Sequence, residues 1–260
     1  MALKDQIGSF CWWSLMTKDV EKANDFYQRL FDWTLDELEI PGEENSTIYV
    51  ASNGGFGNPV SLEKDFPAPS HWIPFITVDN VNETCEQVKK IGGEVYVPAF
   101  DIPTVGRTAV ITDPLGTAFH IFTPENTEDN LNMVGNGAGE VCWMELMVDD
   151  PTPLLPFYSD LFGWQFSEPM SMNGGEYTSF NINGESVGGF LKRPPHVPAM
   201  PPVWMNYFAV ASVDAKAEKA TALGGKIVMP KTEIPETGYF ALIEDPTGAV
   251  SYLFELNSAS

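Results

Sequence analysis

The sequence has few basic residues, and acidic residues outnumber them widely. Lysine and arginine total 14 against 36 aspartates and glutamates, which gives a formal net charge of −22. A field of this sign repels the phosphates of nucleic acids and of anionic membranes, so neither is an expected partner. The expected partner is a small molecule that is neutral, cationic or shielded in a pocket.

Cysteines and long apolar runs are also scarce. The three cysteines, Cys11, Cys85 and Cys142, are too few and too scattered for a disulfide framework or a paired-cysteine zinc site. No segment approaches the roughly 18 apolar residues of a membrane-spanning helix. The amino-terminal residues lack the basic segment and apolar stretch of a secretory signal. These absences predict a cytoplasmic protein with reduced cysteines.

The chain does have length, apolar content and an internal repeat. Its 260 residues, of which 43% are hydrophobic, provide for two domains of roughly 130 residues. At an offset of about 131 residues, segments of the first half return in the same order in the second. Three such pairs are GSFCWWSLM and GEVCWMELM, FYQRLFDW and FYSDLFGW, and DPLGTAFHIF and DPTGAVSYLF. The repeat predicts one domain over residues 1–124, a linker over 125–138 and a second domain over 139–260.

Each half divides again into two modules. An alternating apolar run over Phe10–Met16 predicts a strand, and Asp19 then begins a helix as its N-cap. The segments WTLDELE and STIYVAS predict strands, the glycine-rich run Asn53–Gly57 predicts a turn, and VSLE closes the module. The order recurs with the strand WIPFITV, a helix capped by Asn82 and three more strands. In the second half the residue at which the first helix begins is ambiguous. Pro156 would remove a backbone hydrogen bond if it lay beyond the first turn of that helix.

These blocks, in this order, resemble the vicinal oxygen chelate superfamily, which includes glyoxalase I, bleomycin-resistance proteins and extradiol dioxygenases. The resemblance rests on FY followed by LFxW (Phe26–Trp33 and Phe157–Trp164), on the strand WIPFITVDNV and on the DPxG turn, and it covers nearly the whole chain. More narrowly, the second half is similar to two-repeat bacterial glyoxalase-like proteins. The resemblance implies an α+β fold of two tandem glyoxalase-like domains, each with two βαβββ modules that form a cupped mixed sheet. Such a fold hosts isomerases, dioxygenases, thiol transferases and drug binders, so it does not by itself imply one function.

In this superfamily a divalent metal is usually held by His, Gln or Glu on the first and last strands of the modules. The matching positions here are Trp12, Trp72, His120, Trp143, Trp204 and Tyr252. An indole nitrogen is only a donor, so His120 is the one imidazole or carboxylate ligand at these positions. Even with Glu63 it falls short of the three protein ligands of a catalytic zinc-type site. We therefore expect no cofactor; a divalent metal, if present, is expected on His120 and Glu63.

Residues two apart in a strand share a face, which predicts the side chains that line each cup. In the first half these are Trp12, Ser14, Met16, Trp72, Pro74, Ile76, His120 and Phe122, and in the second Trp143, Glu145, Met147, Trp204, Asn206, Phe208, Tyr252 and Phe254. Two indoles per cup with a few polar groups between them predict an aromatic slot for a flat or apolar small molecule. The alternative is that these aromatics fill the core between sheet and helices.

Glu145 and His120 are the candidate catalytic residues. Desolvation inside an aromatic cup is expected to raise the pKa of Glu145 and to suit it to proton abstraction next to a carbonyl. The alternative for Glu145 is a structural hydrogen bond to Asn206, Tyr252 or the backbone. His120 is either a general base helped by Ser14 or a neutral, hydrogen-bonded histidine of the core.

Arg107 follows the IPTVG turn at the lip of the sheet. It is either a clamp for a carboxylate or phosphate of the ligand or part of an ordinary surface ion pair. Its repeat partner is Tyr239. The predicted ligand-binding set therefore comprises Arg107 and Tyr239 together with Trp12, Ser14, Trp72, Trp143, Trp204, Asn206 and Tyr252.

The sequence favours a metal-independent, glyoxalase-like protein that binds a small carbonyl-bearing or aromatic metabolite and acts on it as a lyase or isomerase. The alternative is a non-catalytic protein that sequesters a drug or metabolite, as bleomycin-resistance relatives do. An acidic surface would attract cationic drugs to such a protein. Four modules already supply the assembly that shorter relatives make by dimerising, so both a monomer and a homodimer are consistent with the sequence.

Overall fold

The computed structural model describes residues 2–42, 46–127, 134–172, 175–198 and 200–257. The helices are a short 3-10 turn (Leu3–Asp5), α1 (Val20–Phe31), α2 (Val81–Lys90), α3 (Leu154–Phe162) and α4 (Val213–Ala222). The strands of the first half are β1 (Phe10–Thr17), β2 (Thr34–Leu38), β3 (Ser46–Ala51), β4 (Gly54–Ser61), β5 (His71–Thr77), β6 (Glu94–Ile102), β7 (Gly106–Thr112) and β8 (Ala118–Pro124). Those of the second half are β9 (Val141–Val148), β10 (Gln165–Phe166), β11 (Met170–Met172), β12 (Gly175–Ile182), β13 (Glu185–Lys192), β14 (Trp204–Ala209), β15 (Lys226–Ile234), β16 (Gly238–Glu244) and β17 (Val250–Leu256). In the part of the chain so described, no helix is both long and apolar enough to cross a membrane.

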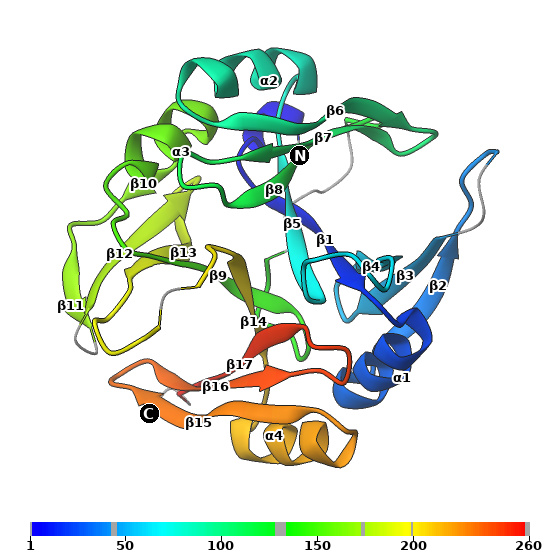
Figure 1. Ribbon diagram of the computed structural model, residues 1–260, viewed down its shortest axis with the longest axis vertical. Coiled ribbons are helices and arrows are strands. Elements are labelled where there is room, and N and C mark those ends of the chain that lie inside the picture. The colour runs from blue at the N-terminus through cyan, green and yellow to red at the C-terminus, as the bar shows by residue number, and fades with distance from the viewer. Residues whose placement is uncertain (1, 43–45, 128–133, 173–174, 199, 258–260) are drawn as a thin grey trace. The chain divides into compact units, whose positions relative to one another are not determined.

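The strands form one mixed sheet in each half. The order is β2-β3-β4-β1-β5-β8-β7-β6 in the first and β10-β12-β13-β9-β14-β17-β16-β15 in the second, with β11 paired to β12. The first and last strands of every module run parallel and adjacent, because the helix that follows the first strand carries the chain back across the sheet. Figure 1 shows α2 beside β6 and β7, and α4 beside β15, so each of these two helices covers one face of its module's strands. The predicted α+β fold with four βαβββ modules is confirmed.

The helix ends follow from local hydrogen bonding. Asp19 caps α1 as predicted, because its carboxylate accepts the N–H of Lys22 at 3.1 Å. The predicted cap of α2 is wrong: Asn80 accepts the N–H of Asn82 at 2.9 Å, and Asn82 is already inside the helix. Pro156 is the third residue of α3, where the backbone N–H has no partner within the helix, so the proline costs no hydrogen bond.

The predicted turn over Asn53–Gly57 is confirmed at its start, because Ser52 and Asn53 form the hairpin turn between β3 and β4, but its remaining residues lie in a strand. Gly54 begins β4, and Gly57 pairs with Trp13 across the parallel ladder. A Cβ on Gly57 would lie 2.4 Å from the carbonyl oxygen of Trp13, so only glycine permits this approach of the two strands. The predicted turn extends too far because glycine serves both tight turns and close backbone contacts, and from Gly54 onward it serves the second.

The chain divides into two compact units, and neither unit is one sequence half. The first unit contains the residues up to Trp12, the second module of the first half from Pro74 onward, and Met144–Trp204. The second unit contains Trp13–Ile73, the residues just before Met144, and the second module of the second half from Met205 onward. Each unit therefore contains one module from each half. The boundaries predicted at residues 124 and 139 stay predictions, and residues 128–133 of the predicted linker lie outside the described residues.

Buried polar groups join the two modules of each unit. In the first unit Trp204 donates its indole N–H to the Tyr158 hydroxyl at 3.2 Å, and that hydroxyl donates to Asp113 at 3.1 Å. The other carboxylate oxygen of Asp113 closes the DPxG turn by accepting the N–H of Thr117 at 2.9 Å. In the second unit Trp72 donates to Tyr27 at 3.1 Å, and the tyrosine lies near Asp245. Burial raises the pKa of both aspartates and of both tyrosines.

Replacing Tyr158 with Phe tests this connection. The variant leaves the Asp113 carboxylate and the Trp204 N–H without their common partner in a dry site, which is expected to cost about 1–3 kcal/mol. Thermal unfolding should show a lowered midpoint. The matched substitution Tyr96→Phe, at a side chain that is 70% exposed, is the control and should leave the midpoint unchanged. Equal midpoints for Tyr158→Phe and the wild type would show that the bond contributes nothing.

Candidate functional site

The first cluster of candidate residues lies in the first unit, on the sheet face opposite α2. We call it the His120 cluster; it comprises Cys11, Trp12, Phe75, Val105, Thr108, His120 and Phe122. The register brings Phe75 beside His120, and the two rings stack with centroids 3.9 Å apart and planes 7° apart. Trp12 is partly exposed and packs against the same cluster.

His120 is held on two sides. Its Nδ1 lies 3.1 Å from the hydroxyl of Thr108, and its ring face lies on Phe75. Burial among apolar groups lowers the pKa of His120 to about 4, because the charged imidazolium is poorly solvated there. At neutral pH the ring is therefore uncharged.

The second cluster lies in the second unit and repeats the first at matching positions. We call it the Tyr252 cluster; it comprises Cys142, Trp143, Met205, Tyr207, Ala209, Phe240, Leu242, Tyr252 and Phe254. Tyr207 and Tyr252 stand where Phe75 and His120 stand in the first half, and their rings stack with centroids 4.2 Å apart. Trp143 is partly exposed, as Trp12 is. The duplication therefore preserves a stacked aromatic pair with a neighbouring indole.

The expected cup positions of Trp72 and Trp204 are wrong. Phe75 follows Trp72 on β5, and Tyr207 follows Trp204 on β14, in each case at an odd spacing, so the two members of each pair face opposite sides of the sheet. Phe75 and Tyr207 face the clusters. The two indoles therefore point to the helix side. There Trp72 bonds Tyr27 of α1, and Trp204 bonds Tyr158 of α3.

The same one-residue shift moves the other residues expected on the cup face of β5 and β14 to the helix side; they are Pro74, Ile76, Asn206 and Phe208. Asn206 is 1% exposed, and its amide makes no hydrogen bond with a described residue. Both strands are buried on their two faces, and a continuous apolar run carries no sign of which face is which.

Glu145 lies on β9 in the first unit and is 7% exposed. Its register partner is Gly189 on β13, and a Cβ on Gly189 would lie 2.3 Å from the ring of Tyr177. The phenol ring of Tyr177 thus lies over Gly189, on the face that this glycine shares with Glu145. Tyr177 was not predicted as a site residue, because its repeat counterpart is Ser46 and nothing in its own segment marks it.

Ser14 occupies the position equivalent to Glu145 in the first half, within the second unit. Its hydroxyl donates to Asn58 at 2.8 Å, and Asn58 is its register partner on β4. The first half therefore has a neutral hydroxyl and amide where the second half has a carboxylate and a glycine.

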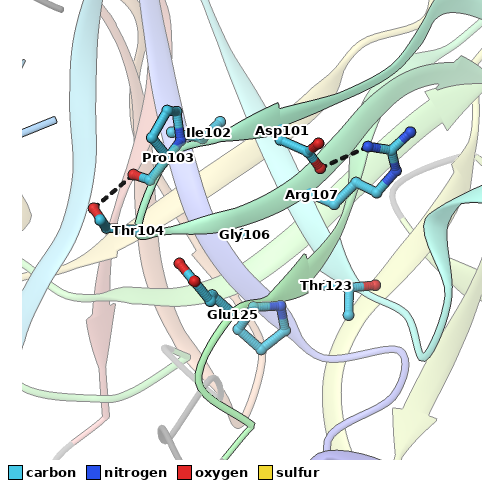
Figure 2. A pocket seen from close by; sticks show the side chains of 9 residues that line it. Asp101, Ile102, Pro103, Thr104, Gly106, Arg107, Thr123 and Glu125 are labelled. Atoms are coloured by element: carbon cyan, nitrogen blue, oxygen red, sulfur yellow. Dashed lines mark hydrogen bonds and ion pairs between the residues drawn. The ribbon is translucent and has the colours of Figure 1, made fainter. Parts of the chain in front are cut away.

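Arg107 lies on the α2 side of β7, away from the His120 cluster. It forms an ion pair with Asp101 at 2.6 Å and donates to Asn82 at 3.2 Å. Figure 2 shows the Asp101 pair at the wall of a surface pocket of about 330 Å³. The pocket is also lined by Ile102, Pro103, Thr104, Gly106, Thr123, Pro124 and Glu125. With its donors engaged in this way, the geometry of Arg107 matches the predicted surface ion pair better than a ligand clamp.

Tyr239, the repeat partner of Arg107, lies on the corresponding side of the second sheet. Lys231 approaches its ring at 4.3 Å and pairs with Asp214 of α4 at 3.0 Å. Neither Arg107 nor Tyr239 belongs to the two aromatic clusters.

The residues present do not fit a catalytic divalent metal. His120 is the one imidazole in the His120 cluster, and Glu63 is exposed beyond the end of β4. Among the described residues no group of three or more His, Cys, Asp or Glu side chains could hold a metal ion. A three-ligand site of the zinc type needs such a group.

Comparison with known proteins agrees with this arrangement of modules. The model of the Glyoxalase/Bleomycin resistance protein/Dioxygenase superfamily matches residues 6–121 and 141–251. The chain belongs to this superfamily. The two matched stretches lie one in each half of the chain.

Similar sequences are named for different activities. A protein of Mycobacterium tuberculosis (strain CDC 1551 / Oshkosh) named "Putative glyoxylase CFP32" is 34% identical, over 92% of this chain and 91% of its own. The anthracycline biosynthesis protein DnrV of Streptomyces peucetius is 28% identical, over 96% of this chain and 94% of its own.

Similar solved structures share the fold at low sequence identity. The 2,3-dioxygenase LapB from Pseudomonas sp. KL28 superposes with a TM-score of 0.65 at 11% identity, covering 96% of this chain and 93% of its own. The Mn(II)-bound glyoxalase from Novosphingobium aromaticivorans gives a TM-score of 0.64 at 13% identity, covering 96% and 82%. At these identities the likeness shows the fold alone.

Gly189→Ala tests the placement of Tyr177 beside Glu145. The added methyl group collides with the phenol ring, and overpacking of this kind costs about 1–3 kcal/mol. Thermal unfolding should show the loss in the wild-type background. In a Tyr177→Ser background, which copies Ser46 of the first half, the same change should cost little. An equal cost in both backgrounds would show that the tyrosine does not lie over the glycine.

Proposed function

We propose that this chain binds a flat, aromatic, carbonyl- or hydroxyl-bearing small molecule against its aromatic clusters, without a protein-bound divalent metal. The observation that carries the proposal is the stacked pair at matching positions, Phe75 with His120 and Tyr207 with Tyr252. Each pair adjoins a partly exposed indole, and such surfaces favour offset stacking of a further aromatic ring. The names of two relatives, both anthracycline biosynthesis proteins, support a polycyclic aromatic ligand.

Metal independence is part of this proposal. It is supported by the donor set, in which a single neutral imidazole stands among aromatic and aliphatic side chains. The low pKa of His120 favours acceptance of a hydrogen bond over proton abstraction by this ring, because a weak base has little driving force to take a proton at neutral pH.

Calorimetric titration with one anthracycline and one hydroxyanthraquinone tests the binding. Trp12→Ala and Trp143→Ala should each weaken the site in their own cluster by about tenfold, which corresponds to the loss of one aromatic contact. Trp12→Phe and Trp143→Phe should retain most of the affinity, and EDTA should change neither. Tyr96→Ala, at an exposed ring outside both clusters, is the control. The proposal fails if neither compound binds, or if both tryptophan-to-alanine variants bind as the wild type does.

A lyase or isomerase reaction is the second candidate function. The burial of Glu145 supports it, because a carboxylate in a dry environment is suited to proton transfer next to a carbonyl. The competing view is sequestration without turnover, for which the net charge of −22 would help to collect cationic compounds.

Glu145→Gln distinguishes these two functions. If the protein is an enzyme that uses this carboxylate, the variant should bind as the wild type does and lose at least about 100-fold in the rate of conversion of the bound compound, followed by its absorbance. Glu140→Gln is the matched control, since Glu140 is another buried glutamate, bonded to Ser52 and the Gly137 N–H. Unchanged conversion in Glu145→Gln would remove this residue from the mechanism, and no conversion by the wild type would favour sequestration.

A further inference from the structure

The hydroxyl of Thr108 lies between the imidazole of His120 and a backbone carbonyl. Its Oγ1 is 2.9 Å from the carbonyl oxygen of Ile121 and 3.1 Å from His120 Nδ1. A hydroxyl group has one proton to donate, and a carbonyl oxygen can only accept. The Thr108 proton is therefore used in the bond to Ile121, and the bond to the imidazole must use a proton on Nδ1.

The alternative arrangement brings two acceptor oxygens together without a proton between them. Thr108 is fully buried, so water does not replace the threonine proton at the carbonyl. If the Thr108 proton pointed at Nδ1 instead, the Ile121 carbonyl would lose its side-chain donor, and two acceptors would face each other in a dry site.

The tautomer decides what the other ring nitrogen can do. A neutral imidazole with its proton on Nδ1 carries a lone pair, and no proton, on Nε2. No described residue makes a hydrogen bond to Nε2, and His120 as a residue is only half-buried. Stacking on Phe75 fixes the plane in which the lone pair points.

We propose that Thr108 is a positioning residue that holds His120 in the Nδ1–H tautomer, so that Nε2 accepts a hydrogen bond from a hydroxyl group of the ligand. The ligand class this implies is a phenol or an enol, because a bare carbonyl or ether oxygen would bring a second lone pair against Nε2. The choice of ligand rests on the proposed binding function, whereas the tautomer does not.

The pair of Thr108 and His120 occurs in the first half and has no equivalent in the second. Phe240 takes the place of Thr108 in the second half, and Tyr252 takes the place of His120. A phenol hydroxyl both donates and accepts, so the second cluster lacks this preference for a donor. The two clusters therefore differ in the ligands that they select.

The tautomer can be read in the free protein from long-range ¹H–¹⁵N correlations of the histidine rings at neutral pH. The chain has only three histidines, and His120→Gln identifies the signal. The wild type should show a protonated Nδ1 and an unprotonated Nε2. Thr108→Val should lose this preference, and Thr108→Ser should restore it.

Thr123→Val is the matched control. Thr123 donates to the Val78 carbonyl at 2.8 Å and makes no contact with the imidazole, so its loss should leave the His120 pattern unchanged. A wild-type ring protonated on Nε2, or a Thr108→Val ring identical to that of the wild type, would overturn the role of Thr108.

A second titration tests the ligand class. The probes are a hydroxyanthraquinone whose hydroxyl lies away from the carbonyls and its methyl ether. The wild type should prefer the free hydroxyl by about tenfold at the first cluster, and Thr108→Val should reduce that preference to about threefold or less. Equal wild-type affinities would overturn the donor preference. If neither probe binds, the proposed binding function fails, while the ring pattern still decides the role of Thr108.

Discussion

The buried hydrogen bond between Tyr158 and Asp113 joins a helix of the second half to a turn of the first. The same carboxylate also closes its own turn, so one aspartate fixes both a local conformation and a long-range contact. In the second unit Tyr27 lies near Asp245, and Asp245 closes its own turn by accepting the N–H of Ala249 at 3.1 Å. Because Tyr158 and Asp113 are buried away from water, each needs its partner, and α3 must therefore pack against a module of the opposite half.

The packing of modules from opposite halves gives the two faces of each sheet different roles. One sheet face packs against helices and holds the Trp72 and Trp204 indoles in hydrogen bonds to buried tyrosines. The other face carries the His120 and Tyr252 clusters, in which the indoles are partly exposed. The four tryptophans thus fall into two classes, one buried and hydrogen-bonded on the helix side and one partly exposed in the clusters.

Duplication has kept the geometry of the clusters and changed their chemistry. The stacked pair is a phenylalanine and a neutral histidine in the first half and two tyrosines in the second. Nearby, Ser14 with Asn58 is replaced by Glu145 with Gly189. Ring stacking is insensitive to these changes, whereas the pattern of donors and acceptors is not. A tandem repeat of this kind can hold two sites of the same shape with different polar requirements.

The sequence by itself determined the repeat, the four modules, the N-cap at Asp19 and the presence of Trp12, His120, Trp143 and Tyr252 near the candidate sites, because these depend on local spacing and on residue type. It did not determine which face of β5 and β14 meets the clusters. Both strands are buried on two sides, so apolar and polar residues do not alternate along them. The register of Phe75 with His120 and of Tyr207 with Tyr252 decides which side chains of these strands face the clusters. The pairing of modules across halves and the contact of Thr108 with His120 also required the tertiary structure, since they join residues through the sheet and the core rather than through neighbouring positions in the chain.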